Sequence, residues 1–364
     1  MNRTTKIIGG IFVGLVVAFL FWEFSNIVFY LLVAIILSLV GKPLVKKIRA
    51  LKIGKYHLPN GLSAFLTLLV IIFFIGLFFS IFIPLVARQA AVISNIDLDS
   101  LSQSIEEPLQ KLEDFLHNYG ILGKEETVNQ VIEIQLKSIL NLTSFSSVLG
   151  SMVGLTGTIF IAVFSIIFLT FFFLKDAFIL DELVENLTPD KYQNEVNNIL
   201  KQTKRLLSRY FIGLLIEITA MITLITTGLT IFGVENAVLI GFFGGLMNII
   251  PYLGPLIGAL IGVILAISTI LSTGMYSELL SITFIILGVF LVAKLIDDFI
   301  LQPLIYSNSV KAHPVEIFLV ILIAGTMAGI TGMILAIPTY TVLRIIAKEF
   351  LSQLSVVQKL TRNI

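Results

Sequence analysis

The sequence predicts an all-α, polytopic integral membrane protein with about eight transmembrane or re-entrant helical segments. Of its 364 residues, 57% are hydrophobic and only 13% are charged, whereas about a quarter of the residues in a soluble domain are charged. Apolar runs recur along the chain, and several approach the roughly 20 residues that a helix needs to cross the hydrocarbon core. The charged residues gather between these runs, which is where a membrane protein can keep them hydrated.

The first region, residues 1–86, carries three apolar runs at 7–22, 27–40 and 62–86. The loop at 41–58 holds six basic residues and no acid: Lys42, Lys46, Lys47, Arg49, Lys52 and Lys55. By the positive-inside rule this loop is cytoplasmic, and so is the N-terminus. The segment that follows the third run, 87–147, is then extracytoplasmic.

Two amphipathic helices are expected within 87–147, because leucines and isoleucines recur there at helical spacing between charges. They could lie against the membrane surface or a neighbouring subunit, or form a cap that gathers a ligand. The chain then crosses the membrane at 148–174, forms a cytoplasmic amphipathic segment at 175–210, and enters a transport core at 211–347. Residues 348–364 are expected to be a cytoplasmic tail.

Two hairpins interrupt the transport core, at 237–271 and 315–346. Pro251 and Pro255 break the first, where Gly254 allows a tight reversal, within the stretch "NIIPYLGPLIG". Broken backbone at membrane depth needs a protein or water cavity, so the break is expected to offer N–H groups, carbonyls and helix ends to a polar ligand. The alternative is an ordinary cytoplasmic turn between two short spans.

In the second hairpin, the helix is expected to break at three glycines, Gly325, Gly329 and Gly332. Its sequence "GMILAIPT" at 332–339, which contains Pro338, agrees with "GVILAIST" at 262–269 at six of eight positions. Common descent and chance in an apolar chain both explain this match. If the two hairpins enter from opposite sides, the span plus broken hairpin forms an inverted repeat, an arrangement typical of secondary transporters.

Ionisable residues occur inside or at the ends of the apolar segments of the core. Glu217 lies about two turns into its span, and Asp297 and Asp298 follow an apolar run. Such groups are costly in a bilayer and are usually paired or functional. Glu217 could pair with Lys294 or Arg344, or it could couple transport to an ion, and at least one of the two aspartates could simply cap the membrane interface.

Motifs for enzymatic chemistry are absent from the sequence. It contains no phosphate-binding loop, no H-E-x-x-H and no G-x-S-x-G. The three histidines are placed on different sides by the predicted topology, and there is no cysteine. We therefore expect no enzyme, no cofactor, no metal site and, with a net charge of +1, no nucleic-acid partner.

The chain resembles the autoinducer-2 exporter (AI-2E) family of transporters over essentially its whole length. "NIIPYLGPLIG" is similar to the family's N-x-I-P-Y-h-G-P signature, and "DD", "QP" and "HP" follow in the family's order. The family motif falls on Asn248, Pro251, Tyr252, Gly254, Pro255, Asp298, Pro303, His313, Pro314, Gly325, Gly329, Gly332 and Pro338. The loop 306–312 departs from the family pattern, which has Gly after Q-P and Leu before H-P.

The resemblance implies a cell-membrane secondary transporter that exports a small polar solute such as autoinducer-2. Cargo would bind at Asn248, Pro251, Tyr252, Gly254 and Pro255. An ion gradient would act through Glu217, Asp297 and Asp298. A Na⁺(K⁺)/H⁺ antiporter and a membrane scaffold that does not transport are the alternatives, and in each case the expected partners are the bilayer and further copies of the chain.

Overall fold

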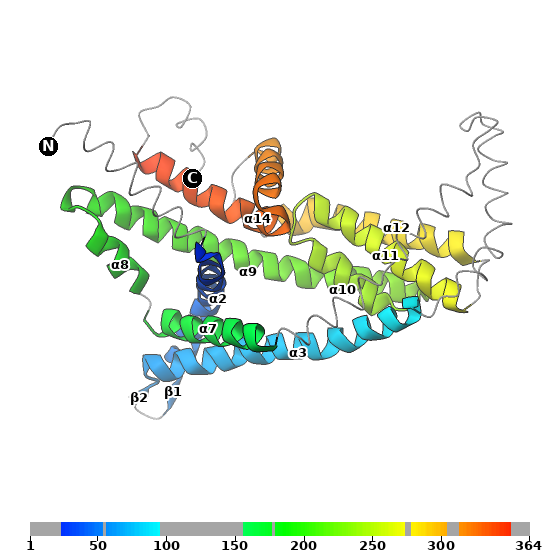
Figure 1. The fold of residues 1–364 in the computed structure, drawn as a ribbon, viewed down its shortest axis with the longest axis horizontal. Coiled ribbons are helices and arrows are strands. Elements are labelled where there is room, and N and C mark those ends of the chain that lie inside the picture. The colour runs from blue at the N-terminus through cyan, green and yellow to red at the C-terminus, as the bar shows by residue number, and fades with distance from the viewer. Residues whose placement is uncertain are drawn as a thin grey trace. The chain divides into compact units, whose positions relative to one another are not determined.

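The computed structural model describes residues 23–53, 56–94, 156–176, 179–273, 278–303 and 313–350. Helices make up almost all of the described chain (Figure 1), so the predicted all-α class is confirmed. A short antiparallel strand pair, with Lys52 opposite His57, joins two of them. The elements are α2 (Ser25–Ala50), β1 (Lys52–Ile53), β2 (Tyr56–His57), α3 (Asn60–Ser94), α7 (Thr156–Lys175), α8 (Ile179–Leu187), η1 (Asp190–Tyr192), α9 (Gln193–Ile231), α10 (Ala237–Met247), α11 (Leu253–Thr273), α12 (Leu279–Ile296), η3 (Asp297–Leu301) and α14 (Pro314–Phe350).

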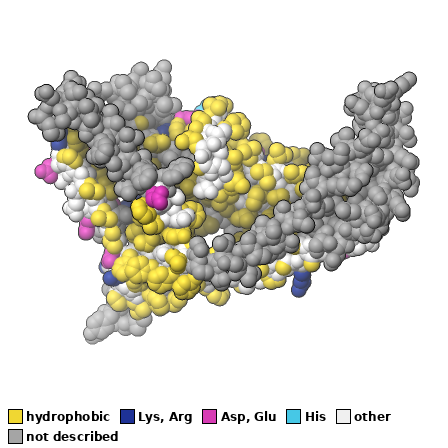
Figure 2. Space-filling model, viewed as in Figure 1, with side chains coloured by type: hydrophobic (Ala, Val, Ile, Leu, Met, Phe, Trp, Pro, Cys, Tyr) yellow, Lys and Arg dark blue, Asp and Glu magenta, His cyan; other side chains and the backbone are white. Residues whose placement is uncertain are grey.

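Six helices within the described residues are long and apolar enough to cross a membrane. Two further apolar helices, Ile159–Lys175 and Ala237–Met247, are shorter. Among the side chains coloured in Figure 2, hydrophobic ones dominate and charged ones are few. Large apolar side chains such as Phe73 and Phe160 point outward, which suits a surface surrounded by lipid tails rather than water.

The described chain forms two compact units, and α3, α9 and α14 each continue from one into the other. In the first unit, α2 packs against α7. Gly41 makes this approach possible, because a Cβ atom there would lie 2.9 Å from Leu174 Cδ2 and 3.1 Å from Ile71 Cδ1. Leu174 is buried with Ala64 and Leu68 of α3 in the small core of this unit.

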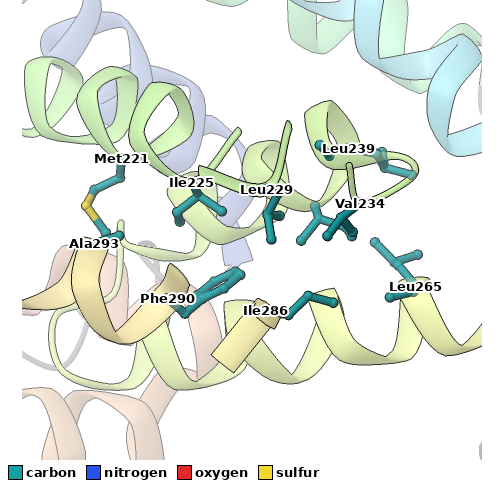
Figure 3. Close-up of a cluster of buried hydrophobic side chains, with 12 residues drawn as sticks. Met221, Ile225, Leu229, Val234, Leu239, Leu265, Ile286, Phe290 and Ala293 are labelled. Carbon is teal, nitrogen blue, oxygen red and sulfur yellow. The ribbon is translucent and has the colours of Figure 1, made fainter. Parts of the chain in front are cut away.

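The second unit is built on a larger apolar core. Figure 3 shows Ile225 and Leu229 of α9 facing Phe290 and Ile286 of α12. The core also takes in Leu265 of α11. This core brings α9, α10, α11 and α12 together and holds the first broken hairpin.

Glycines let the helices of this hairpin approach backbone to backbone. A Cβ atom on Gly258 of α11 would lie 2.8 Å from the Cα atom of Gly244 in α10. On its other side α10 meets α9, where a Cβ atom on Gly241 would lie 2.8 Å from the backbone nitrogen of Thr226. Glycine is required at these crossings because the facing atoms are backbone and cannot rotate away.

Several predicted segments meet different boundaries in the structure. The second half of the predicted cytoplasmic segment 175–210, from Gln193 on, and the following span form one continuous helix, α9. Helix α3 runs to Ser94, beyond the apolar run. Helix α9 contains no proline, and it continues through Gly213 as an α-helix. The apolar run 7–22, the amphipathic helices expected within 95–147 and the tail 351–364 lie outside the described residues.

Candidate functional site

The first break is a compact turn between α10 and α11. The N–H groups of Asn248, Ile249 and Ile250 donate to the carbonyls three residues earlier at 3.0–3.2 Å, and those of Leu253 and Gly254 donate at 2.8 Å to Pro251 and Ile250. The expectation that the break leaves its N–H groups open is therefore wrong for these five residues. The turn satisfies these N–H groups itself, so the polar groups it can offer a ligand are side chains and the carbonyls that accept none of these bonds.

Gly254 is needed for this geometry. A Cβ atom there would collide with the carbonyl oxygen of Met247, at the end of α10. Tyr252 takes the left-handed conformation, with φ of 66°, which costs a residue with a Cβ atom roughly 1–2 kcal/mol. Pro251 and Pro255 flank this strained residue, and Pro255 lies in the first turn of α11, where its missing N–H costs least.

A buried polar pair joins the break to α9. The Nδ2 atom of Asn248 donates to the Oε1 atom of Glu217 at 3.0 Å, and the two residues are only 3% and 4% exposed. The predicted partners of Glu217 were Lys294 and Arg344, and Asn248 was not among them. A carboxylate at this depth needs such a donor, because burying an unpaired charge costs several kcal/mol.

A second polar cluster surrounds the two aspartates after α12. Lys294 Nζ lies 3.1 Å from Asp297 Oδ2 and 2.6 Å from Asp298 Oδ1, and Gln302 Nε2 reaches the same two atoms at 2.9 and 3.2 Å. Asp297 is completely buried, whereas the Asp298 side chain is 45% exposed. Within the described part of the chain, no hydrogen bond reaches the other carboxylate oxygen of Asp297, Oδ1.

A π-helical turn, η3, creates this cluster. It widens the helix after Ile296, so that Asp297, Asp298 and Gln302 all direct polar atoms to one place. Sequence reasoning missed Gln302, although its position four and five residues after the aspartates was a usable signal. Pro303 follows directly and is exposed.

Tyr252 connects the first break with the aspartate cluster and with the second hairpin. Its side chain lies within electrostatic range of Lys294 and Asp298, and its ring meets that of Phe318 edge-on at 6.1 Å between centroids. Of the five residues predicted to bind cargo, Tyr252 is the most exposed. It is therefore the one best placed to meet a solute.

The second break lies at Ala328 and Gly329 in α14, where the φ and ψ angles of Gly329 are 59° and −143°. The two arms fold back closely, because a Cβ atom on Gly332 would collide with the carbonyl oxygen of Ala324. Figure 1 shows the arms of α14 running in different directions. Pro338 is buried inside the second arm without a further kink.

The tip of the first hairpin packs against the arms of the second, away from the reversal at Gly329. Ile250, at the first break, is buried with Ile321 and Ala336 from the two arms of the second hairpin. His313 and Pro314 begin this hairpin, where the His313 N–H donates to the Oε2 atom of Glu316 at 3.3 Å. The structure thus brings the predicted cargo residues and the second hairpin together, and it places Glu217 and Asp297 in two separate polar groups beside them.

Comparison with known proteins agrees with this architecture. The sequence matches the group described as "AI-2E family transporter" over residues 10–352. It is 30% identical over 347 residues to "Putative transport protein YueF" of Bacillus subtilis (strain 168), covering 92% of this chain and 88% of that protein. It is 29% identical over 192 residues to YrrI of the same strain, covering 53% and 52%, and 23% identical over 242 residues to MJ1177 of Methanocaldococcus jannaschii, covering 66% and 68%. YrrI and MJ1177 bear the same description. The chain belongs to the AI-2E family of transporters.

Proposed function

We propose that this protein is a secondary transporter that exports a small polar solute by using an ion gradient. The observation that carries the proposal is the buried Asn248–Glu217 pair at the break of the first hairpin. An ionisable residue buried inside a membrane-spanning helix is usually paired or part of an ion pathway. The partner of Glu217, Asn248, belongs to the same turn as Tyr252. Binding or release of an ion at Glu217 would therefore alter the turn that holds the solute.

The two kinds of residue have different roles in this proposal. Asn248, Tyr252 and the turn formed by Pro251, Gly254 and Pro255 contact the solute, and the second hairpin closes over it. Glu217, Asp297 and Asp298 respond to the ion. Autoinducer-2, to which the family name refers, is a natural first candidate among small polar solutes.

Liposomes with an imposed proton or sodium gradient test this function. We expect wild-type protein to accumulate a polar solute from a defined panel, and Glu217→Gln to lower this uptake to the level of protein-free liposomes. Glu235→Gln is the matched control, since Glu235 is an exposed carboxylate in the same half of the chain, and it should transport normally. Uptake by Glu217→Gln equal to that of Glu235→Gln would contradict the proposed coupling.

A Na⁺(K⁺)/H⁺ antiporter is the second candidate, and Asp297 favours it. Its Oδ1 atom is buried and, among the described residues, takes part in no hydrogen bond, so it has an acceptor position that a cation could fill. A pH-sensitive dye inside vesicles should then report proton movement when sodium or potassium is added. Asp297→Asn should abolish the signal, whereas a signal that survives this change while polar solutes move would favour the exporter.

We also propose that the protein resides in the cell membrane as a homo-oligomer, with both termini in the cytoplasm. The basic residues at the end of α2 support this orientation, and the exposed apolar side chains of α14 offer a surface for another copy. The sequence contains no cysteine, so a single cysteine in place of Lys47 can be labelled without background. Labelling in whole cells only after permeabilisation is the expected result.

A further inference from the structure

A positively charged pocket lies in the first unit, well away in sequence from the proposed transport site. Its volume is about 480 Å³, and it is bordered by the last turns of α2, the end of α7 and the beginnings of α3 and α8. The charged side chains that line it are Lys42, Lys46, Arg49, Lys175, Asp176 and Glu182. A pocket of this size is in the range of small-ligand sites.

The three basic residues of α2 lie on one face of the helix. Lys42, Lys46 and Arg49 are spaced four and three residues apart, and Val45 of the same face also lines the pocket. Lys47, one residue after Lys46, does not line it. Basic residues at a cytoplasmic helix end need no ligand to explain them, because they suit both the helix dipole and the positive-inside rule. Their convergence on one concave site is not explained in that way.

The positive charge in the pocket is not neutralised by its neighbours. Lys175 lies 3.7 Å from Asp176, and Lys204, close by, is bonded to Asp181. Across the ranges that the structure describes, Lys42, Lys46 and Arg49 form no salt bridge. Lys42 is partly buried and is repelled by Lys46 and Lys204, with only partial relief from Asp181. Bound anionic charge would relieve this repulsion.

The depth of the pocket indicates which anion would bind there. The apolar sequences of α2 and α7 end at Val40 and Leu174, directly beside the lining residues. The pocket therefore lies where the hydrocarbon core gives way to lipid headgroups. Basic pockets between membrane helices at this depth suit phosphate-bearing headgroups, and the excess of cations on the α2 face is of the required sign. Asn60, at the start of α3, adds an amide for hydrogen bonding.

We propose that this pocket binds the phosphate headgroup of an anionic phospholipid. The lipid would tie the end of α2 to the end of α7 and the beginning of α8, elements that border the pocket. This binding is independent of the transported solute and of the coupling ion.

The test compares lipid retention by purified full-length protein in phosphatidylcholine nanodiscs titrated with phosphatidylglycerol. Diffuse attraction to anionic lipid contributes about fivefold per basic residue at a membrane surface, so Lys46→Gln/Arg49→Gln, which also remove direct contacts to the bound phosphate, should weaken phosphatidylglycerol binding by more than about thirtyfold. Both residues are exposed, and unchanged thermal unfolding in detergent would verify that the double variant folds. Lys47→Gln is the control, because it removes one charge at the same helix end that does not line the pocket; it should weaken binding by no more than the roughly fivefold of diffuse attraction, and by less than Lys46→Gln or Arg49→Gln alone.

Two outcomes would overturn the proposal. Equal weakening by Lys46→Gln, Arg49→Gln and Lys47→Gln would mean that the basic residues attract anionic membranes diffusely, without a pocket. Inorganic phosphate, titrated by calorimetry in detergent micelles without lipid, is expected to bind much more weakly than phosphatidylglycerol. Phosphate binding of comparable affinity, lost in the double variant, would instead assign the pocket to a soluble anion.

Discussion

The two broken hairpins of this protein have the same plan but differ in how firmly they are packed. Each reverses at a residue with positive φ, Tyr252 in the first and Gly329 in the second. In each, a glycine shortly after the reversal passes the carbonyl of the preceding arm, Gly254 at Met247 and Gly332 at Ala324. The reversal itself therefore depends on the same device in both places.

The surroundings of the two hairpins differ. Seven of the eleven residues of α10 are buried, and half of the apolar window of α11 is buried, against 11% of the window in the helix that contains the second break. Met327 and Ile330, on either side of the second reversal, are 81% and 67% exposed. Low burial is typical of segments that move. If one hairpin gates the site while the other holds it, we expect the second to be the gate.

The largest difference between the hairpins is expected when a methyl group is added to a packing glycine in each. Gly258→Ala places a Cβ atom 2.8 Å from the Gly244 backbone, which cannot yield, so we expect destabilisation near the upper end of the roughly 1–3 kcal/mol typical of overpacking. Gly325→Ala meets only the flexible side chain of Met333, with its Cε atom at 2.6 Å. It should be neutral or stabilise the protein by up to about 1 kcal/mol, because alanine favours the helix.

Thermal unfolding of the two variants in detergent measures this difference. The wild-type protein and Gly288→Ala serve as references, since Gly288 of α12 has open space around it. Equal destabilisation by Gly258→Ala and Gly325→Ala would show that the second hairpin is as tightly packed as the first, and the distinction between holder and gate would fail.

Sequence reasoning recovered the plan of these hairpins but not their environment. A break in the first hairpin is predicted by Pro251, Pro255 and Gly254, because their effects on the backbone are local. The glycines at 325, 329 and 332 predict the break in the second hairpin in the same way. The Asn248–Glu217 bond joins residues 31 positions apart, and no local signal indicates which of several polar residues will meet Glu217. The composition of 193–231 changes from charged to apolar, which predicts two segments, whereas in the structure both halves form one helix, α9.

The matching octapeptides at 262–269 and 332–339 also looked more informative than the structure makes them. Gly332 lies three residues after the reversal at Gly329, whereas Gly262 lies ten residues after Tyr252. Gly332 packs on a carbonyl of the opposite arm, a role that Gly254 has in the first hairpin. The octapeptides therefore do not occupy equivalent positions in the two hairpins. An inverted relationship between the hairpins has to be argued from their reversals instead.

A smaller effect is expected at the second reversal itself. Gly329→Ala meets no neighbour within 4 Å, but its φ and ψ angles are unfavourable for any residue with a Cβ atom. We expect a loss of about 1–3 kcal/mol from backbone strain alone. Because the strain acts only while the tight reversal is formed, this variant should also increase labelling of a cysteine introduced at Ala336, which is buried against the first hairpin. Lower stability without any change in labelling would mean that the second hairpin does not open.

The smallest effect on stability is expected at the first reversal, from Tyr252→Gly. Glycine removes the strain of the positive φ angle, a gain of roughly 1–2 kcal/mol. It also loses the edge-on contact with Phe318, worth about 0.5–1.5 kcal/mol, and it raises the entropy of the unfolded chain. These terms nearly cancel, so thermal unfolding should change little while solute transport falls sharply. A residue that keeps a strained conformation with almost no net stability to gain from it is held there for another reason, and the reason that we propose is contact with the solute. If Tyr252→Gly transports as well as the wild type, the strain must be explained by the turn alone, and the place of Tyr252 in the cargo site would be lost.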